Sequence, residues 1–560
     1  MSKVVIVGGV AGGMSAATRL RRLDENAEII IFEKGPYVSF ANCGLPYHVS
    51  GEIADRDKLL VQTPETLYDR FRLDVRPHTE VLAINPEDKT VSVKHNGEVL
   101  TESYDKLILS PGARPFVPAI SGLSECNNVY TLRNVPDLDQ IMERINGSDP
   151  KEAVVVGAGF IGIEMAENLK HRGINVTIVE KAPHVLPPLD EEMAAFVQNE
   201  LREHGVKVIT SQSAVAFKEE GRIVVLEDGS ELTTDMTVMS IGVQPENRLA
   251  QSTGIKLGFR GGILVDENYE TSISDIYAVG DAIVVKNQVT GEDALISLAS
   301  PANRQGRQVA DVIAGMKRKN KGSIGTAIVR VFGLSAASAG LNERMAKMAG
   351  LEVASVHTLS SSHASYYPGA TDITLKLVFN PKDGTIYGAQ GIGSKGVDKR
   401  IDIISTAIKA GLTVHDLPEL EFTYAPPFGS AKDPVNMIGY AALNVMEGMS
   451  ELVQWHELNE ELENGAVLLD VRSELELEES GRFPNSINIP LNDLRDRVNE
   501  LDKDQAYVIS CRSGQRSYIG ERLLKQLGYQ VKNLDGAFAL YQTVKPEEIE
   551  ILKMEEVEIV

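Results

Sequence analysis

The fold is decided by residues 152–162, EAVVVGAGFIG, in which a run of β-branched residues leads into three glycines. Their GxGxxG spacing permits a tight turn, close approach of a pyrophosphate, and close packing of a helix on a strand. A second apolar strand ends at Glu180, 18 residues beyond Gly162, where a carboxylate can bond both ribose hydroxyls. This βαβ unit is therefore predicted to bind NADH; Lys181 weakens the preference, so NADPH remains an alternative. The predicted NAD-binding residues are Gly157, Gly159, Phe160, Ile161, Gly162, Glu180 and Gly242.

The same pattern opens the chain. Residues 3–9, KVVIVGG, precede an Ala-rich helical stretch and a strand that ends at Glu33. This glycine motif is irregular, because Val10 takes the place of the middle glycine. Far downstream, residues 277–282, YAVGDA, predict a strand whose Asp281 accepts a hydrogen bond from a ribityl hydroxyl of a flavin. Two nucleotide-binding domains in series follow from these patterns.

An N-terminal glycine motif paired with a distant Gly-Asp strand resembles the two-dinucleotide flavoprotein disulfide reductases, of the pyridine nucleotide-disulfide oxidoreductase family. In that family the NAD domain is inserted into the FAD domain, and residues 110–112 and 240–242 match its two chain crossovers. The resemblance extends to about residue 445 and implies FAD as a cofactor. The FAD-binding residues it implies are Gly8, Val10, Ala11, Gly12, Gly13, Glu33, Lys34, Ser110, Pro111, Gly112, Asp281 and Ala299.

Residues 39–47, SFANCGLPY, contain one cysteine, Cys43, without the second that an internal dithiol needs. A cysteine in such a segment is either a buried small hydrophobe or a reactive thiol in a loop that enters a helix. In the second case the helix N-terminus and an oxidised flavin both favour the thiolate. The oxidised form of a lone Cys43 is then a sulfenic acid, a persulfide, or a mixed disulfide with a small thiol.

This segment closely resembles that of coenzyme A disulfide reductases, whose single cysteine cycles through a Cys–S–S–CoA mixed disulfide. Three arginines within residues 19–22 form a basic cluster in an acidic chain. The cluster is either a solvated helix face or a site for the phosphates of CoA, and the resemblance favours the second interpretation. The CoA-binding residues it implies are Arg19, Arg22, Ser39 and Asn42.

Two tyrosine sites also match this family, Tyr366 with Tyr367, and Tyr424. The resemblance implies that one tyrosine from each site reaches the cysteine of the opposite subunit, where a phenol protonates a departing thiolate. The spacing to Tyr424 favours Tyr366, and the arrangement requires a homodimer. The resemblance also places Phe160 as an aromatic gate over the flavin face, with Glu164 on the same helix. It places Asn303 and Arg304 on the helix whose N-terminal part faces the pyrimidine end of the flavin.

A further cysteine lies in residues 511–517, CRSGQRS, between a predicted strand and a predicted helix. Consecutive backbone N–H groups in such a loop form a cradle for an anion or a persulfide. Arg512 and Arg516 are expected to lower the pKa of the thiol and to attract anionic sulfur donors. Phosphatases share a similar loop, but Asp470, Arg472 and residues 481–490 resemble the rhodanese sulfurtransferase signature. The predicted persulfide site comprises Cys511, Arg512, Ser513, Gly514, Gln515, Arg516 and Ser517.

The predicted fold class is α/β, with two Rossmann-like dinucleotide-binding domains, an α+β dimerisation domain and a C-terminal α/β rhodanese domain. Residues 190–204 predict an amphipathic helix, and residues 325–445 mix β-rich segments with apolar helices but carry no phosphate motif. The predicted domains are 1–115 and 246–322 (FAD-binding), 116–245 (NADH-binding), 323–447 (dimerisation) and 448–560 (rhodanese-like).

Composition sets the outer limits on function. The chain has 560 residues and a formal net charge of −23, so non-specific nucleic-acid binding is not expected. No run of eighteen apolar residues and no signal-peptide pattern occurs, and three cysteines are too few for a disulfide framework. We therefore expect a cytoplasmic protein without membrane contact. The ten histidines show no metal-ligand spacing, so no metal is expected.

Both modules and their order resemble fused coenzyme A disulfide reductase–rhodanese proteins. The predicted activity is NADH-dependent, FAD-containing reduction of CoA persulfide, polysulfide or CoA disulfide at Cys43, with rhodanese sulfur transfer at Cys511. Two alternatives remain open: an NADH peroxidase or oxidase that uses a Cys43 sulfenate, and a non-enzymatic, redox-sensing sulfur carrier.

Overall fold

The computed structural model describes residues 2–551, so residue 1 and residues 552–560 of the predicted C-terminal domain lie outside it. The chain forms two compact units, which are described separately. Unit 1 comprises residues 1–185 and 204–325, and unit 2 comprises residues 186–203 and 326–560. Within the described residues, no helix combines the length and apolar character that crossing a bilayer requires.

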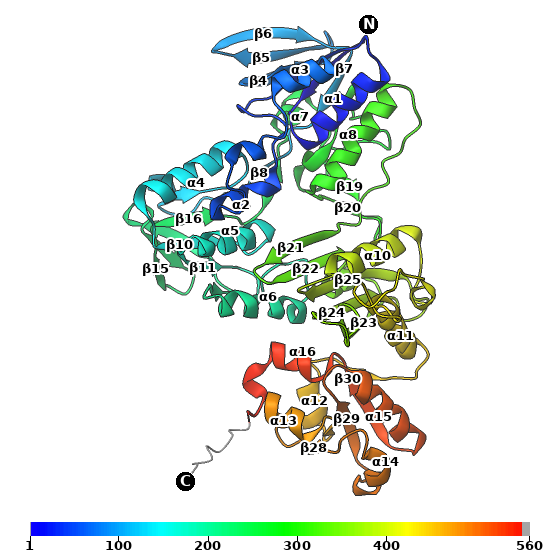
Figure 1. Ribbon diagram of the computed structural model, residues 1–560. Coiled ribbons are helices and arrows are strands. Elements are labelled where there is room, and N and C mark those ends of the chain that lie inside the picture. The colour runs from blue at the N-terminus through cyan, green and yellow to red at the C-terminus, as the bar shows by residue number, and fades with distance from the viewer. Residues whose placement is uncertain (1, 552–560) are drawn as a thin grey trace. The chain divides into compact units, whose positions relative to one another are not determined.

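The first glycine motif of unit 1 lies on a five-stranded parallel sheet of order β18-β7-β1-β2-β3. Its strands are β1 (Lys3–Val7), β2 (Glu28–Phe32), β3 (Asp74–Arg76), β7 (Lys106–Leu109) and β18 (Ile276–Ala278). Helices α1 (Ala11–Leu23) and α8 (Ala299–Ile313) lie side by side (Figure 1). A Cβ on Gly306 would come within 2.1 Å of the carbonyl oxygen of Gly12, so the two helices meet at glycines.

The second glycine motif lies on another five-stranded parallel sheet, of order β12-β11-β10-β16-β9. Its strands are β9 (Val129–Tyr130), β10 (Glu152–Val156), β11 (Asn175–Val179), β12 (Lys207–Ile209) and β16 (Met236–Met239), with helices α4 (Val135–Ser148) and α5 (Phe160–His171). The β-branched residues of the central strands β1, β2, β10 and β16 are buried, because strands covered on both faces need apolar side chains throughout. Both predicted βαβ units are confirmed.

Smaller elements complete unit 1. Antiparallel sheets are formed by β4 (Thr79–Asn85), β5 (Thr90–His95) and β6 (Glu98–Ser103), and by β13 (Ala214–Lys218), β14 (Ile223–Leu226) and β15 (Glu231–Thr233). Strand β8 (Ala113–Pro115) pairs with β17 (Val243–Pro245), and β19 (Val285–Lys286) pairs with β20 (Asp293–Ala294). The short helices are α2 (Leu45–Ser50), α3 (Pro64–Phe71) and α7 (Arg248–Thr253). The β8–β17 pair joins the two segments that directly follow the predicted chain crossovers.

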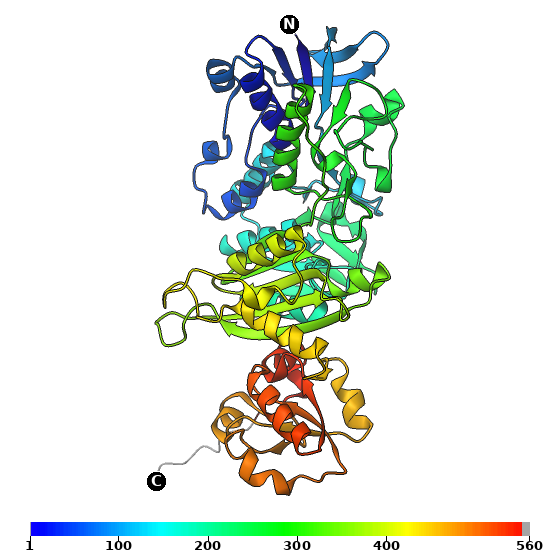
Figure 2. The same ribbon diagram turned by 90° about the vertical axis from the view of Figure 1, so that its right-hand side faces the viewer.

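Unit 2 contains an antiparallel sheet of order β21-β22-β25-β24-β23. Its strands are β21 (Ala327–Val331), β22 (Leu334–Gly340), β23 (Ala354–Ser361), β24 (Asp372–Phe379) and β25 (Ile386–Gly393), with helices α9 (Glu343–Met348), α10 (Val397–Ala410) and α11 (Pro434–Met446). This is the predicted α+β domain, and α11 leads from it into the C-terminal domain (Figure 2).

One helix belongs to a different compact unit from its neighbours in the chain. Helix α6 (Glu191–Glu203) falls within the predicted NADH-binding segment 116–245, yet residues 186–203 belong to unit 2. Its apolar face is buried, and Glu192 forms an ion pair with Lys376 of β24. Packing across residues distant in sequence, rather than chain order, sets the place of this helix.

The C-terminal domain of unit 2 is a parallel sheet of order β26-β30-β29-β27-β28. Its strands are β26 (Leu452–Val453), β27 (Val467–Asp470), β28 (Ile487–Asn488), β29 (Ala506–Ser510) and β30 (Gln530–Leu534). Its helices are α12 (Leu458–Glu463), α13 (Glu474–Ser480), α14 (Leu494–Arg497), α15 (Gln515–Gln526) and α16 (Ala537–Val544). The predicted separate α/β domain is confirmed.

Candidate active site

The predicted FAD-binding residues gather at the carboxyl edge of the first parallel sheet. Gly8 follows β1, Glu33 follows β2, Ser110 follows β7 and Asp281 follows β18, while Ala299 begins α8. The predicted NAD-binding residues gather in the same way, after β10, β11 and β16 of the second sheet. Ligands of doubly wound sheets bind at this edge, so the fold brings each predicted set together.

The two glycine turns share one geometry. Gly8 and Gly157 have φ of +100° and +103°, a region that L side chains rarely adopt. A Cβ on Gly13 would lie 2.0 Å from the carbonyl oxygen of Gly8, and one on Gly162 would lie 2.0 Å from that of Gly157. A Cβ on Gly159 would project into open space, the side from which a pyrophosphate approaches. Gly8 and Gly13 are thus the outer glycines of the irregular motif.

The acid at the end of each second strand is held by backbone N–H groups. Glu33 accepts hydrogen bonds from Gly9 N (2.9 Å) and Gly35 N (2.8 Å). Glu180 accepts hydrogen bonds from Ala158 N (2.6 Å) and Ala182 N (2.8 Å). Each carboxylate oxygen has a second lone pair for a ribose hydroxyl, so the residues present fit a dinucleotide at both turns.

Cys43 lies in a 3₁₀ turn, η1 (Asn42–Gly44), and is exposed. Loss of hydration on its protein-facing side raises the pKa of its thiol; the carboxylate of Glu164 raises the pKa further, while Arg133 lowers it. The groups of the chain around Cys43 therefore raise the pKa of its thiol, and the predicted preference for the thiolate, which includes the effect of an oxidised flavin, stays a prediction. The helix that follows, α2, has only six residues.

Arg133 is a residue of this site that sequence reasoning missed. Its Nε donates to the carbonyl oxygen of Ala113 (2.8 Å), and its Nη2 lies 3.7 Å from Oδ2 of Asp281. Its own carbonyl oxygen accepts a hydrogen bond from Asn42 Nδ2 (3.5 Å), beside Cys43. Gly112 leaves room for it, because a Cβ there would lie 2.8 Å from Nη2 of Arg133. No motif marks Arg133 in the sequence.

Ser39 and Asn42, the residues predicted to line the thiol end of CoA, lie in the same segment as Cys43. Ser39 has a left-handed backbone, φ +48°, and its N–H donates to the carbonyl oxygen of Gly9 (2.8 Å). This bond ties the cysteine segment to the first glycine turn. Asn42 Oδ1 is buried and has no hydrogen-bond partner among the described residues, so an acceptor is available for a donor group of a ligand.

The basic cluster on α1 is divided by the structure. Arg19 Nε lies 2.6 Å from Oδ1 of Asp311, and Arg318 Nε lies 2.8 Å from Oδ2 of the same carboxylate. Arg21 is buried and donates to backbone carbonyls such as that of Phe71 (2.8 Å), so it is a structural residue. Arg22 is exposed. Each arginine of the cluster thus meets a different environment, and buried Arg21 is not among the residues predicted to bind CoA.

The two tyrosine sites of unit 2 lie together. The hydroxyls of Tyr366 and Tyr424 are 3.3 Å apart, and this hydrogen bond raises the pKa of Tyr366. Tyr367 instead packs edge-on against the ring of His363. Buried Arg400 connects the two loops, since its Nη2 donates to Ser362 O (2.9 Å) and to Asp433 Oδ2 (2.8 Å). Of the two neighbouring tyrosines, Tyr366 is thus the one that contacts Tyr424, while the predicted roles of the tyrosines stay predictions.

Cys511 begins the loop between β29 and α15, and it is buried. Its Sγ accepts a hydrogen bond from Gly514 N (3.1 Å) and a long one from Ser517 Oγ (3.4 Å). One backbone N–H and one hydroxyl of the loop thus donate to the sulfur, and the wider cradle predicted for residues 511–517 stays a prediction. The N-terminus of α15, which starts at Gln515, adds partial positive charge beside it.

The two loop arginines, which are predicted to attract anionic donors, are each paired with a carboxylate. Arg516 makes two hydrogen bonds to the carboxylate of Glu476, at 2.6 and 2.7 Å. Arg512 Nη2 lies 2.6 Å from Oδ2 of Asp372, on the antiparallel sheet of unit 2. Each positive charge is offset by a carboxylate that only the tertiary fold supplies.

Comparison with known proteins identifies the first module. Residues 2–306 match the model of the pyridine nucleotide-disulphide oxidoreductases. The chain belongs to this family. Residues 326–434 match the dimerisation domain of the pyridine nucleotide-disulphide oxidoreductases, and residues 454–543 match the rhodanese-like domain.

Relatives of this oxidoreductase cover one or both modules. A coenzyme A disulfide reductase of Staphylococcus haemolyticus is 37% identical over 445 residues, which are 79% of this chain and 99% of that protein. The crystal structure of reduced Bacillus anthracis CoADR-RHD is 52% identical with a TM-score of 0.96, over 98% of this chain and 99% of that one. A NAD-dependent persulfide reductase from A. fulgidus is 40% identical with a TM-score of 0.92, over 96% and 100%.

The predicted resemblance to a coenzyme A disulfide reductase–rhodanese fusion is confirmed by these matches, as is the predicted fold class. The protein is an oxidoreductase with a dimerisation domain and a rhodanese domain. The family supports the predicted cofactors FAD, NADH and CoA. The predicted domain boundaries and residue roles stay predictions.

Proposed function

We propose that the protein is an NADH-dependent, FAD-containing reductase of sulfur bound to CoA, which works through a Cys43–S–S–CoA mixed disulfide. The observation that carries this proposal is a single exposed cysteine, tied through Ser39 to the first glycine turn and without a second cysteine in its segment. The names of the relatives support the substrate class, which is CoA disulfide or a persulfide.

The residues that hold the two nucleotides follow from the turns. The first glycine turn, Glu33 and Asp281 hold FAD, and the second turn with Glu180 holds NADH. When bound, FAD supplies the route by which the reducing pair of NADH reaches a disulfide. A carboxylate at Glu180 disfavours a 2′-phosphate, which supports NADH over NADPH.

Cys43 performs the sulfur chemistry. Its thiolate attacks the sulfur atom of CoA itself. The S–S bond of the substrate breaks, and hydrosulfide leaves CoA persulfide, or CoA thiolate leaves CoA disulfide, with the electron pair. The new bond is Cys43–S–S–CoA, and its two-electron reduction releases CoA and restores Cys43. Arg133 favours the thiolate, whereas Glu164 and Asp281 disfavour it, so the charge balance of these side chains sets the reactive fraction.

The tyrosines supply a proton in a homodimer. Tyr366, hydrogen-bonded to Tyr424, donates to the thiolate that departs from the partner's Cys43. Arg400 positions both loops for this role. Arg19 and exposed Arg22 bind phosphates of CoA. Arg19 forms an ion pair with Asp311, and Arg318 is a second partner of that carboxylate.

Cys511 carries sulfane sulfur as a persulfide to or from the same substrate. The N–H of Gly514 and the hydroxyl of Ser517, which both donate to its Sγ, support a persulfide anion. Persulfide or polysulfide is favoured over CoA disulfide as the physiological substrate, because plain disulfide reduction needs no sulfurtransferase loop. Three cysteines without a disulfide framework favour a reducing, cytoplasmic location.

The test uses purified flavoprotein. We expect NADH oxidation with CoA persulfide, with sulfide released, and reductant should release CoA from the oxidised protein, identified by its mass. Robust peroxide turnover without any CoA requirement would instead establish the peroxidase or oxidase alternative. Full flavin content with no NADH turnover on any sulfur substrate would establish the non-enzymatic carrier.

A further inference from the structure

A cavity of about 540 Å³ lies within unit 2, between the rhodanese domain and the antiparallel sheet. On one side, Arg472, Arg512 and Gly536 follow the carboxyl ends of β27, β29 and β30. The Cys511 loop extends from the end of β29 and contributes Arg512 to the cavity wall, and ligands of parallel sheets bind at this edge. The cavity wall is also bonded to the loop, because Phe538 N donates to the carbonyl oxygen of Cys511 (3.0 Å).

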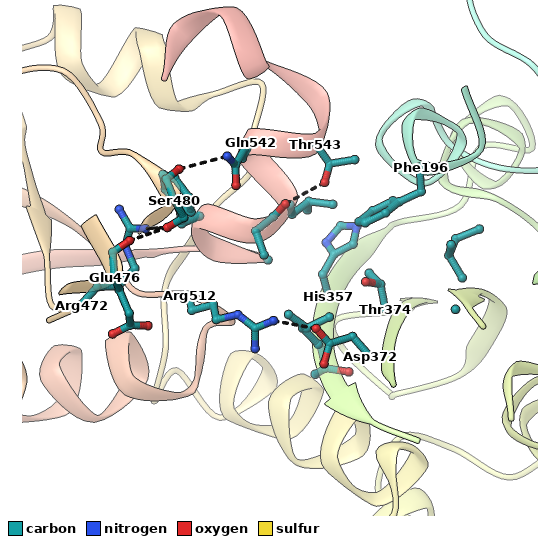
Figure 3. Close-up of a pocket in the computed structure, with 18 of the residues that line it drawn as sticks. Phe196, His357, Asp372, Thr374, Arg472, Glu476, Ser480, Arg512, Gln542 and Thr543 are labelled. Atoms are coloured by element: carbon teal, nitrogen blue, oxygen red, sulfur yellow. Dashed lines mark hydrogen bonds and ion pairs between the residues drawn. The ribbon is translucent and has the colours of Figure 1, made fainter. Parts of the chain in front are cut away.

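The charges around the cavity cancel in pairs. Arg512 meets Asp372 at 2.6 Å, and Figure 3 shows the two side chains extending toward each other from the two domains. Arg516 is engaged twice by Glu476, itself a lining residue. The third guanidinium, of Arg472, lies 2.7 Å from Oδ2 of Asp470.

The balance is not positive. Glu479 also lines the cavity and is exposed, which adds negative charge to a wall whose two arginines, Arg472 and Arg512, each have a carboxylate partner. His357, which also lines the cavity, is likewise paired, with Asp535 and Glu192. Much of the remaining lining is apolar, as these side chains show: Phe196, Leu334, Leu359, Ile392, Phe538 and Leu540. A small dianion loses hydration there without meeting an unpaired cation, which is unfavourable. A sulfur species with an apolar arm and at most one charge at its reactive end fits better.

We propose that this cavity is the donor and acceptor site of Cys511, and that Asp372, from the dimerisation domain, is a specificity-determining residue that selects alkyl persulfides over small dianionic donors such as thiosulfate. The inference rests on the proposed role of Cys511 as the sulfur carrier. Asp372 acts through Arg512: by occupying this guanidinium, it withholds the cation that a dianion needs.

Both donor reactions balance. With an alkyl persulfide, the Cys511 thiolate attacks the outer sulfur; the donor S–S bond breaks and an alkyl thiolate leaves, so Cys511–S–SH forms. With thiosulfate, the same thiolate attacks the sulfane sulfur; that S–S bond breaks, sulfite leaves with the electron pair, and Cys511–S–S⁻ forms. The two donors differ in the negative charge that they bring to the loop, and Asp372 controls whether a cation is available to meet that charge.

The test measures single-turnover persulfide formation on Cys511 of the full-length flavoprotein, by alkylation and mass spectrometry. Cysteine persulfide and thiosulfate are the two probes. In wild type we expect cysteine persulfide to react at least about tenfold faster. Asp372→Asn should raise the thiosulfate rate by about tenfold and change the cysteine persulfide rate by less than about twofold.

Two matched variants complete the design. Asp372→Glu keeps the charge and should keep wild-type selectivity, and Asp402→Asn removes a charge from an exposed position of α10 and should change neither rate. An unchanged thiosulfate rate in Asp372→Asn, or an equal rise with both donors, would overturn the inference while leaving the role of Cys511 intact. Failure of wild-type Cys511 to accept sulfur from either donor would instead overturn the proposed function.

Discussion

Cys43 and Cys511 are placed in opposite ways. Cys43 is exposed in a short 3₁₀ turn, and its Sγ has no hydrogen bond among the described residues. Loss of hydration on its protein-facing side and nearby carboxylates raise the pKa of its thiol. Cys511 is buried, and its Sγ is held by a backbone N–H and a hydroxyl at the start of a helix. The chain itself therefore supplies the hydrogen-bond donors around the sulfur of Cys511, whereas the reactivity of the Cys43 thiol depends on the groups that bind beside it.

The largest expected effect separates the two thiols directly. Cys43→Ser should lower NADH-dependent reduction of CoA disulfide by at least about 10³-fold, because a serine hydroxyl cannot form the mixed disulfide. Persulfide formation on Cys511 should be retained. Steady-state NADH oxidation and mass spectrometry of Cys511 measure the two outcomes, and loss of both would show that the thiols act as one unit.

The reciprocal change should have a narrower effect. Cys511→Ser should abolish the sulfur transfer that starts from an alkyl persulfide and leave CoA disulfide reduction within about twofold of wild type. Sulfide release and thiol release, measured in parallel, distinguish the two activities. If every sulfane donor is reduced as fast by the variant as by wild type, sulfur relay through Cys511 is excluded.

The charge balance at Cys43 is tested by a pair of opposite variants. Glu164→Gln removes a carboxylate that raises the pKa of Cys43, so the pH profile of its alkylation should move to lower pH. Arg133→Gln removes the opposing cation and should move the profile to higher pH. Rates of iodoacetamide alkylation against pH give both profiles, with Cys511 as the internal reference. Shifts in the same direction would contradict this electrostatic account.

The smallest effect concerns how the rhodanese domain is held. Buried His357 lies 2.7 Å from Oδ2 of Asp535 and 3.1 Å from Oε1 of Glu192, which is also paired with Lys376. Burial alone lowers the pKa of His357, but these carboxylates more than offset it and raise the pKa to about 9. The folded chain thus holds this proton to higher pH than the unfolded chain, whose histidine has a pKa near 6.5.

The stability contributed by protonated His357 is therefore full below about pH 6.5 and is lost as pH rises through 9. Between pH 7 and 9.5 we expect Tm to fall by a few degrees more in wild type than in His357→Asn, measured by calorimetry. His456→Asn, at an exposed position, is the control and should follow wild type. A wild-type Tm that falls no more than that of His357→Asn would show that the histidine is neutral in the folded chain.

Most of the fold was accessible from the sequence, because its signals are local. A β-branched run, glycines at fixed spacing and an acid at the next strand end specify each βαβ unit, and both units are found. The irregular first motif was also resolved correctly, since Gly8 and Gly13 are the outer glycines. The exception is α6: its amphipathic pattern predicts a helix but does not say which sheet covers its apolar face.

The sites were predicted less completely, for the same reason. Lone cysteines, paired tyrosines and the loop after β29 are marked by short motifs. Arg133 carries no motif, and its role arises from contacts with Ala113, Asn42 and Asp281. The arginines of α1 look alike in sequence, yet Arg21 is buried and donates hydrogen bonds to backbone carbonyls, while Arg19 is paired with Asp311.

The sequence by itself determined which chemistry is present: two dinucleotide turns, one thiol near the first of them, and a second thiol in an anion cradle. Only the tertiary structure decided the charge that each thiol meets. Arg512 and Asp372 are 140 residues apart in the chain and 2.6 Å apart in space, and Arg516 meets Glu476 across 40 residues. Local pattern specifies backbone geometry, whereas ion pairing depends on distances that arise only when separate elements pack.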